Sequence, residues 1–488
     1  MTIDFQKILQ SLAYNPKDPL VFNSGFFLIF MAVFFFFYQF IYKHKLSRVI
    51  YFTVFSLFFF YKACGFYFLL IILSAVVDFN LANWIHRIQK PTPKKLLLAF
   101  SIAINLGLLA YFKYTNFFID IINDLQSGHI HPLHLILPVG ISFYTFENLS
   151  YTIDVYRGHF KPITNFLDYC FFLSFFPKLM MGPIVRASDF IPQIRHDIVL
   201  TKEDIGKGFF LILGGVFKKV IISDYIYLNY VEYIFDNPKM YSGIECLIAV
   251  YGYAMVIYCD FSGYSDIAIG IARWMGFKIP MNFNSPYQSS SITEFWRRWH
   301  ISLSSWLRDY LYISLGGNRK GRFRQYINLM LTMLLGGLWH GASWQFVFWG
   351  GMHGIALALD KAWTTFIKVR KTILTRIVGI IITFHFVCFC WIFFKASTFS
   401  DAIIILQQIF TNFNGKAFGA LIRGYDTVLI MLIIGYVVHF IPQWIEKRME
   451  QKFINLHTVG RIIVFLIFIW IVIQIKSADQ MLPIYLQF

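Results

Sequence analysis

The chain has 488 residues, of which 57% are hydrophobic and only 14% are charged, and its formal net charge is +17. Because a soluble domain carries about 25% charged residues, this composition excludes an ordinary soluble protein and predicts a polytopic membrane protein. In a soluble protein the positive charge would suggest nucleic-acid binding. Here the cations fall in short loops between apolar runs, which is typical of the cytoplasmic side of a membrane protein. We therefore predict no nucleic-acid partner.

The first third of the chain contains four apolar runs, at about 25–42, 49–61, 65–82 and 96–114. Basic loops follow the first and the third run: Lys43, Lys45 and Arg48, then Arg87, Lys90, Lys94 and Lys95. If each run crosses the membrane once, both loops lie on the same side. The excess of Lys and Arg makes that side cytoplasmic and places the N-terminus outside the cytoplasm.

The middle of the chain carries apolar runs that are broken and polar. Pro138 and Gly140 interrupt the run 136–158, which contains Glu147, and Lys178 lies within the run 173–186. Such segments must be covered by protein or line a cavity when they lie at membrane depth. Further runs follow at about 208–222, 245–275, 325–360, 377–395, 426–443 and 460–475. The sequence therefore predicts an all-α polytopic membrane protein of roughly ten to twelve membrane elements, in a single domain over 1–488.

Two histidines stand out as candidates for catalysis. His340 lies in the sequence LWHGASW inside an apolar run, where a polar group usually has a partner or a function. His300 lies on a predicted amphipathic helix, with Trp296, Ser304 and Leu307 at helical spacing on its side. Acyl transfer to a hydroxyl needs a base and a donor that stabilises the developing oxyanion. We predict His340 as the base and His300 as a hydrogen-bond donor or orienting group; the alternative is that each imidazole only bonds a helix carbonyl.

Polar residues near these histidines form a predicted supporting network of Asp260, Asp266, Arg297 and Ser304. The two carboxylates lie in the apolar segment CDFSGYSDIAIG. They could orient the histidines or bond arginines, or they could belong to a buried polar network that fixes helix packing. Both interpretations stay open at this point.

A basic segment, GGNRKGRFRQ, precedes the run that holds His340. It contains Arg319, Lys320, Arg322 and Arg324. The simpler interpretation is a cytoplasmic loop that follows the positive-inside rule. The sharper one is a surface where a phosphorylated thioester donor, coenzyme A or an acyl carrier protein, approaches. The chain has no Walker-type phosphate loop, and we predict neither a metal site nor a bound cofactor.

Several motifs together resemble the bacterial membrane-bound O-acyltransferase (MBOAT) family, in particular its alginate O-acetyltransferase branch. They lie mainly within a core at about 130–363 and are found at 138–158, 175–186, 260–276, 282–318 and 336–350, with a terminal PIYLQF. The resemblance implies a many-helix fold around a central channel. It also implies that the histidine of the WHG motif, His340, is catalytic and that the histidine of the WRRWH motif, His300, is the second recurrent one.

The function that we expect from this resemblance is membrane O-acyl transfer in the bacterial cytoplasmic membrane. Acetyl would pass from acetyl-CoA, or from an acyl carrier protein thioester, to hydroxyls of an extracytoplasmic cell-envelope polysaccharide. The transfer would be direct or through a partner acetyltransferase outside the cytoplasm, with membrane lipid around the spans. D-alanyl transfer from a carrier protein, as in teichoic acid D-alanylation, is an alternative, and a transporter or flippase is an alternative of another class.

Overall fold

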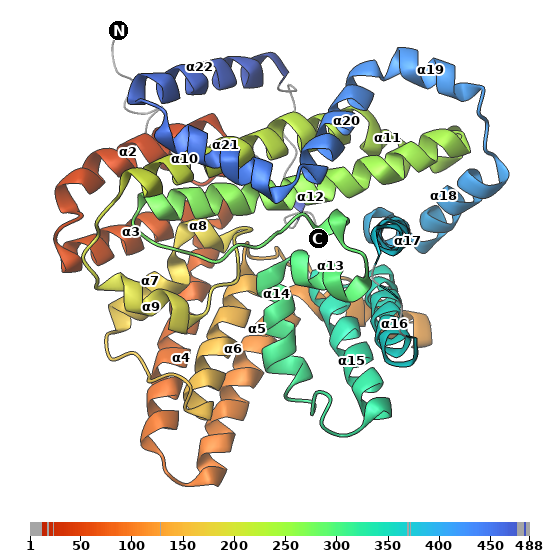
Figure 1. Cartoon of the computed structure of the whole chain (residues 1–488). Helices are drawn as coiled ribbons and strands as arrows, with labels where there is room; N and C mark the ends of the chain where they lie inside the picture. Colours follow the sequence, from red (N-terminus) through yellow and green to blue (C-terminus); the bar gives the residue numbers. More distant parts are fainter. Residues whose placement is uncertain are drawn as a thin grey trace. The chain divides into compact units, whose positions relative to one another are not determined.

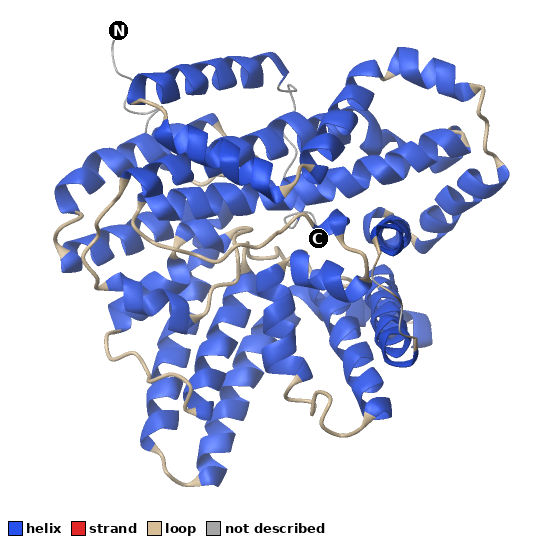
Figure 2. Ribbon diagram, viewed as in Figure 1, coloured by secondary structure: helices blue, strands red, loops and turns tan. Residues whose placement is uncertain are grey.

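The computed structural model describes residues 12–16, 19–22, 24–126, 128–367, 370, 372–475 and 483–484. All regular elements in these residues are helices, and Figure 2 draws no strand among them. The prediction of an all-α polytopic membrane protein is confirmed. The chain packs into two compact units, Met1–Thr201 with Ile271–Pro280 and Lys202–Gly270 with Met281–Phe488. The units describe packing, and the assignment of 1–488 to one domain stays a prediction.

Within the described residues, five helical stretches are long and apolar enough to cross a membrane: Lys45–Arg87, Pro91–Gln126, Gly243–Trp274, Ile373–Lys395 and Thr458–Ile475. The helices α19 (Ala417–Gly424) and α20 (Asp426–Phe440), bent by 87°, make a sixth if they are one span. This number is lower than the roughly ten to twelve membrane elements expected from apolar runs. That expectation counted short and broken segments, such as α2 (Gly25–Ile41), which are not full-length spans.

The first unit contains α2, α3 (Lys45–Cys64), α4 (Phe68–Arg87), α5 (Pro91–Gln126) and α6 (Ile141–Arg157). Each of the four predicted runs of the first third overlaps one of the helices α2 to α5, and α3 and α5 extend beyond their runs at both ends. The helices α4, α5 and α6 run alongside one another (Figure 1). The turn between α3 and α4 lies at Gly65, whose φ of 64° is a left-handed value that glycine adopts without strain.

The broken segments of the first unit are covered by protein, as the sequence predicts. Gly140 precedes α6 with a φ of 74°, and a Cβ there would lie 2.5 Å from the carbonyl oxygen of Leu179. Lys178, on the four-residue α8 (Phe176–Leu179), forms a buried ion pair with Glu147. The other carboxylate oxygen of Glu147 accepts the backbone N–H of Val185 at 3.1 Å. The charges are thus paired inside the unit, alongside α7 (Phe166–Ser174) and α9 (Ala187–Ile194).

The second unit begins with α10 (Lys202–Val216), which continues as the π-helical η2 (Phe217–Asp224) and packs on α12 (Gly243–Trp274). A Cβ on Gly215 would lie 2.5 Å from the carbonyl oxygen of Gly263, so the missing side chain lets the two backbones touch. The other helices of this unit are α11 (Glu232–Asp236), α13 (Ile292–Arg298), α14 (Ile301–Trp306), α15 (Arg322–His340), α16 (Trp344–Phe366), α17 (Ile373–Lys395), α18 (Phe399–Thr411), α19, α20, α21 (Gln443–Asn455) and α22 (Thr458–Ile475).

Candidate active site

The segment that holds His340 is a tight helical hairpin of α15 and α16 (Figure 1). The predicted run 325–360 is therefore not one helix: it breaks directly after His340, at 341–343. Glycine allows the two helices to approach closely, since a Cβ on Gly337 would lie 2.2 Å from the carbonyl oxygen of Phe346. The hairpin consequently holds His340 at its closed end, at the C-terminus of α15.

The imidazole of His340 is buried and surrounded by aromatic rings. His340 is only 3% exposed. Its ring centroid lies 5.0 Å from that of Trp339, 5.1 Å from that of Trp349 and 5.5 Å from that of Phe394. Such an apolar surrounding strengthens every electrostatic interaction that the imidazole makes with a bound group.

His300 lies at a break between α13 and α14, and the predicted continuous amphipathic helix is wrong at this point. Its φ of 42° is left-handed, which ends one helix and begins the next. Asn282 explains the break, because its backbone carbonyl accepts the N–H of Ile301 at 2.9 Å and its side-chain oxygen accepts the N–H of Ser302 at 3.2 Å. These bonds draw the backbone out of the helical path.

The hydrogen bond between His300 and Asn282 fixes which ring nitrogen carries the proton. The Nδ1 atom of His300 lies 3.1 Å from the side-chain oxygen of Asn282. The backbone N–H of Ser302 also donates to that atom, so it is the oxygen, and Nδ1–H of His300 must be the donor. Burial lowers the pKa of His300 to about 3, so the ring is neutral near pH 7. Its Nε2 atom can then accept but not donate, which favours an orienting role over that of an oxyanion donor.

The structure brings the two predicted histidines to the same indole. Trp339 lies 5.0 Å from the ring of His340 and 6.1 Å from the ring of His300, between centroids. Phe261 contacts His300 edge-to-face at 4.6 Å. Trp339 is therefore a neighbour that both histidines share.

A third buried histidine, His353, is not among the residues predicted from the sequence. It is fully buried on α16, and its ring lies 4.8 Å from Trp349 and 5.1 Å from Trp296. Its sequence context, GGMHG, carries the same signal as the context of His340: an ionisable side chain among apolar and small residues.

The carboxylates Asp260 and Asp266 bind lysines. Lys219 Nζ lies 2.5 Å from Asp260 and 2.7 Å from Asp224, and Lys218 Nζ lies 2.6 Å from Asp266. The second oxygen of Asp260 accepts the backbone N–H of Ile484 at 3.0 Å. Of the two interpretations left open, the structure favours the buried network that fixes helix packing, here of η2 on α12.

The other two members of the predicted network have different positions. The Ser304 hydroxyl donates to the carbonyl of Trp299 at 3.1 Å, and so stabilises the backbone at the break before α14. Arg297 is exposed, whereas its neighbour Arg298 pairs with Glu294 at 2.8 Å. Ser304 thus bonds the backbone beside His300, and Arg297 lies on the surface; their role as a supporting network stays a prediction.

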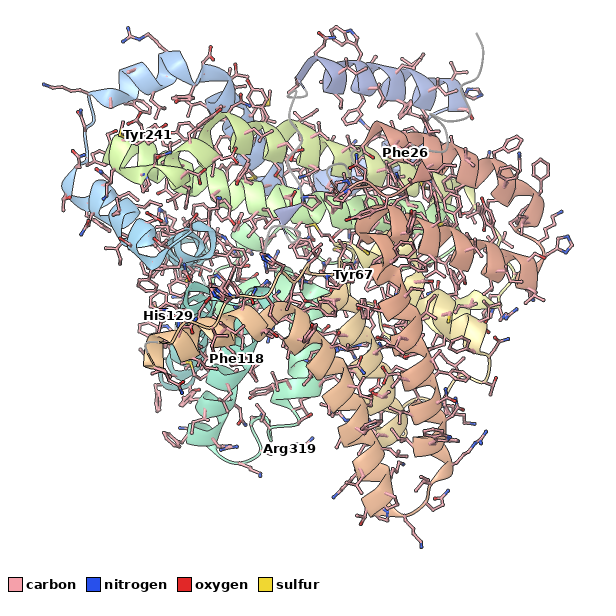
Figure 3. All side chains as sticks on the ribbon, turned by 180° about the vertical axis from the view of Figure 1, so that it is seen from behind. Phe26, Tyr67, Phe118, His129, Tyr241 and Arg319 are labelled. Atoms are coloured by element: carbon pink, nitrogen blue, oxygen red, sulfur yellow. The ribbon has the colours of Figure 1, made fainter. Side chains whose placement is uncertain are left out.

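The basic segment is an exposed loop and first turn. It contains four cationic residues, all of them exposed: Arg319, Lys320, Arg322 and Arg324. Figure 3 labels Arg319 on this loop, which leads into α15. The guanidinium of Arg322 lies 5.7 Å from the ring centroid of Phe366, and such stacking leaves the charge accessible to an anion. The loop and the first turn of α15 therefore present four positive charges at the start of the helix that ends in His340.

These residues can supply acid–base and hydrogen-bonding chemistry. A buried imidazole can take a proton from a hydroxyl, and a second neutral imidazole can orient the reacting groups. Among the residues that the structure describes, no group of three His, Cys, Asp or Glu side chains is placed to hold a metal ion.

Comparison with known proteins identifies the family. A model of the membrane-bound O-acyltransferase family (MBOAT) matches residues 159–399. The peptidoglycan O-acetyltransferase of Helicobacter pylori is 37% identical over 391 residues, which cover 75% of this chain and 74% of that protein. The chain belongs to the membrane-bound O-acyltransferase family. The family confirms the prediction of an O-acyltransferase and favours it over a transporter or flippase.

Two further relatives show the range of this family. The probable alginate O-acetylase AlgI of Pseudomonas aeruginosa is 41% identical over 344 residues, 67% of this chain and 65% of that protein. The teichoic acid D-alanyltransferase of Bacillus subtilis is 32% identical over 287 residues, 55% of this chain and 71% of that protein. The resemblance to the alginate branch of the family is thus confirmed.

Proposed function

We propose that this protein transfers acetyl from a thioester on the cytoplasmic side of the membrane to hydroxyls of an extracytoplasmic cell-envelope polysaccharide. The observation that carries the proposal is the names of two relatives. One is a peptidoglycan O-acetyltransferase that is 37% identical to this chain, and the other is a probable alginate O-acetylase that is 41% identical. The transfer is direct or passes through a partner acetyltransferase outside the cytoplasm. Residues 1–488 would form one membrane domain for this reaction.

In the proposed reaction His340 is the general base. It takes the proton of the acceptor hydroxyl while the hydroxyl oxygen attacks the thioester carbonyl carbon. The new C–O bond forms, the C–S bond breaks, and the proton passes from His340 to the departing thiolate, which leaves as a thiol. His300 orients this arrangement, supported by its bond from Nδ1–H to Asn282 and by its contact with Trp339. Preorganised groups of this kind need no rearrangement during the reaction.

The test is thioester consumption by the purified protein in detergent or nanodiscs. We expect acetyl-CoA, or an acetylated carrier protein, to be consumed, and consumption to require His340. Acetyl analysis of cell-surface glycans from cells with and without the protein then names the acceptor. No thioester consumption by a monodisperse, correctly inserted protein with either donor would contradict the proposal.

D-alanyl transfer is the second candidate, because the teichoic acid D-alanyltransferase of Bacillus subtilis is 32% identical over 287 residues. The two candidates differ in the donor. Side-by-side incubation with acetyl-CoA and with a D-alanyl carrier protein separates them, since only the correct donor is consumed at a rate that depends on His340.

The exposed basic loop is proposed to steer a polyanionic donor. We expect replacement of Arg319, Lys320, Arg322 and Arg324 by Gln to raise the apparent KM for the donor, most strongly at low ionic strength. Salt screens such attraction beyond about 10 Å at 0.1 M. The measurement is donor KM at two salt concentrations.

The matched control for the loop replaces four other exposed cations, Lys416, Arg423, Lys447 and Arg448, in the same way. This control changes the net charge equally but leaves the loop before α15 intact. A donor KM that is equal in both variants at low salt would show that the loop serves only membrane topology.

We also propose that the protein lies in the bacterial cytoplasmic membrane with its N-terminus outside the cytoplasm. Two basic loops, at 43–48 and 87–95, support this orientation through the positive-inside rule. The stretch Lys45–Arg87 between them has 43 residues, about twice the roughly 20 residues needed for one crossing. A cysteine at Asn15 should react with an impermeant reagent added outside intact spheroplasts, and one at Thr92 only after lysis. Labelling of both from the same side would refute the orientation.

A further inference from the structure

A cluster of three side chains beside His340 contains polar atoms that the fold does not satisfy. We define the indole–imidazole cluster as Trp296, Trp349 and His353. The centroid of the His353 ring lies 4.8 Å from Trp349 and 5.1 Å from Trp296, and the two indoles lie 5.8 Å apart. The exposed fraction is 0% for His353, 1% for Trp349 and 9% for Trp296. The cluster is therefore shielded from solvent.

Four polar atoms of this cluster are buried without a hydrogen-bond partner among the residues that the structure describes. They are both ring nitrogens of His353 and the Nε1 atoms of the two indoles. Most buried polar side-chain atoms have a partner, and each exception needs an explanation such as a bound water or ligand. Four exceptions in one contact cluster point to one bound group rather than to four separate defects.

The chemistry of the four atoms selects what can bind. An indole N–H can only donate, whereas a neutral imidazole donates at one nitrogen and accepts at the other. An ammonium group has no lone pair for the indoles. A carbonyl oxygen has no proton for the imidazole acceptor. A hydroxyl oxygen accepts up to two hydrogen bonds and donates one, so it meets both kinds of atom and can bind up to three of the four.

The backbone holds the cluster rigidly. Asp360 on α16 accepts the backbone N–H of Thr293 at 2.9 Å, and the Ser291 hydroxyl caps α13 by accepting the N–H of Glu294 at 3.2 Å. The first bond attaches the start of α13 to α16, which carries both other members of the cluster, and the second stabilises the start of α13 itself. Trp296 is thereby fixed against His353, and a bound oxygen would meet donors and an acceptor that are already in place.

The position of the cluster connects it to the reaction. The ring centroid of Trp349 lies 4.8 Å from that of His353 and 5.1 Å from that of His340, so both imidazoles have the same indole as a neighbour. We propose that the indole–imidazole cluster is an inner subsite that binds a hydroxyl oxygen beside His340: a hydroxyl of the acceptor, or a water in its place. This inference rests on the proposed function of His340 as the base in acyl transfer to a hydroxyl.

The first test is structural and does not depend on activity. An experimental density map of the wild-type protein, at a resolution that shows ordered waters, is expected to contain an oxygen within hydrogen-bond distance of His353 and at least one of the two indoles. The His353→Phe protein should lack it, because Phe keeps the size of the ring but offers no polar atom. A wild-type map with the three rings in direct contact and no bound oxygen would overturn the subsite.

The second test separates the two sources of the oxygen. Acetyl-CoA is offered with glycerol as a soluble hydroxyl probe, and acetylglycerol and free acetate are measured. If the subsite holds an acceptor hydroxyl, His353→Phe should lower the ratio of acetylglycerol to acetate about tenfold, as expected for one or two lost hydrogen bonds. If it holds the water that attacks in place of an acceptor, release of acetate should fall about tenfold while acetylglycerol stays unchanged, so that the ratio rises.

Two variants decide whether the effect is one of binding or of packing. His353→Gln retains one donor and one acceptor and should restore part of what His353→Phe loses. The control His439→Phe changes another buried histidine, on α20, which accepts the N–H of Tyr287 at 3.1 Å and should leave the ratio unchanged. Equal losses in His353→Phe and His353→Gln, or unchanged products with only a lower Tm, would overturn the proposal. A wild-type protein that forms neither product would defeat the proposed function instead, and the map would still decide the subsite.

Discussion

Purified His340→Ala protein is expected to consume thioester at least about 10²-fold more slowly than wild type, because a positioned general base typically contributes about 10²–10⁴-fold. The site offers little to replace it. The ring of His340 is enclosed by Trp339, Trp349 and Phe394, and the substitution leaves an apolar void rather than a new base. The measurement is turnover of acetyl-CoA, or of the acetylated carrier protein, by equal amounts of inserted protein.

The control for this prediction is a histidine that is equally buried but lies elsewhere in the second unit. His439 is 4% exposed and contacts Tyr258 and Tyr287, so His439→Ala creates a similar void without removing the proposed base. We expect it to keep most of the turnover while lowering the Tm by a similar amount. His340 is not the base if His340→Ala elutes as a single species and keeps more than about a tenth of wild-type turnover. Such a loss would be far smaller than the expected loss of at least about 10²-fold.

The helices could be predicted from the sequence because run length and hydropathy are local properties. The runs 25–42, 245–275 and 377–395 correspond closely to α2, α12 and α17. The split of 325–360 into α15 and α16 also had a local signal. Gly341 and Ser343, which follow His340, are residues typical of a helix end and a helix start. An apolar run with such signals predicts a hairpin rather than one span.

Contacts between distant parts of the sequence could not be predicted in the same way. Asp260 is 41 positions from Lys219 and 224 from Ile484, yet it binds both. Only the close approach of η2 to α12 makes the lysine the partner. For the same reason the sequence left open whether Asp260 serves the histidines or the packing.

The break at His300 is the clearest case of tertiary structure overriding a local pattern. Helical spacing over 296–307 favours one amphipathic helix. Asn282 instead provides two acceptors, its backbone and side-chain oxygens, that bind the N–H groups of Ile301 and Ser302. The first helix therefore ends at Arg298 and the next begins at Ile301, and His300 between them is fully buried. No residue within 296–307 indicates this.

The second large effect is expected at the pair of His300 and Asn282. Replacing His300 by Ala should lower turnover about 10²-fold, a loss of the size that a misplacement of about 1 Å of the reacting groups can cause. Replacing Asn282 by Ala should have nearly the same effect, since it removes the acceptor that fixes the Nδ1–H tautomer of His300. The measurement is turnover at saturating donor for the two single variants and the double variant.

The double variant decides how the pair acts. The effects of substitutions in one hydrogen-bond network are not additive. The turnover of the double variant should therefore lie within about threefold of that of the slower single variant. Ser302→Ala is the matched control, because it removes the hydroxyl that donates to the same Asn282 oxygen at 2.9 Å but leaves the bond from His300 intact. It should reduce turnover by less than about fivefold, the effect of one ordinary hydrogen bond. Fully additive losses, with a double variant about 10⁴-fold slower than wild type, would mean that Asn282 acts on the reaction by itself and does not act by orienting His300.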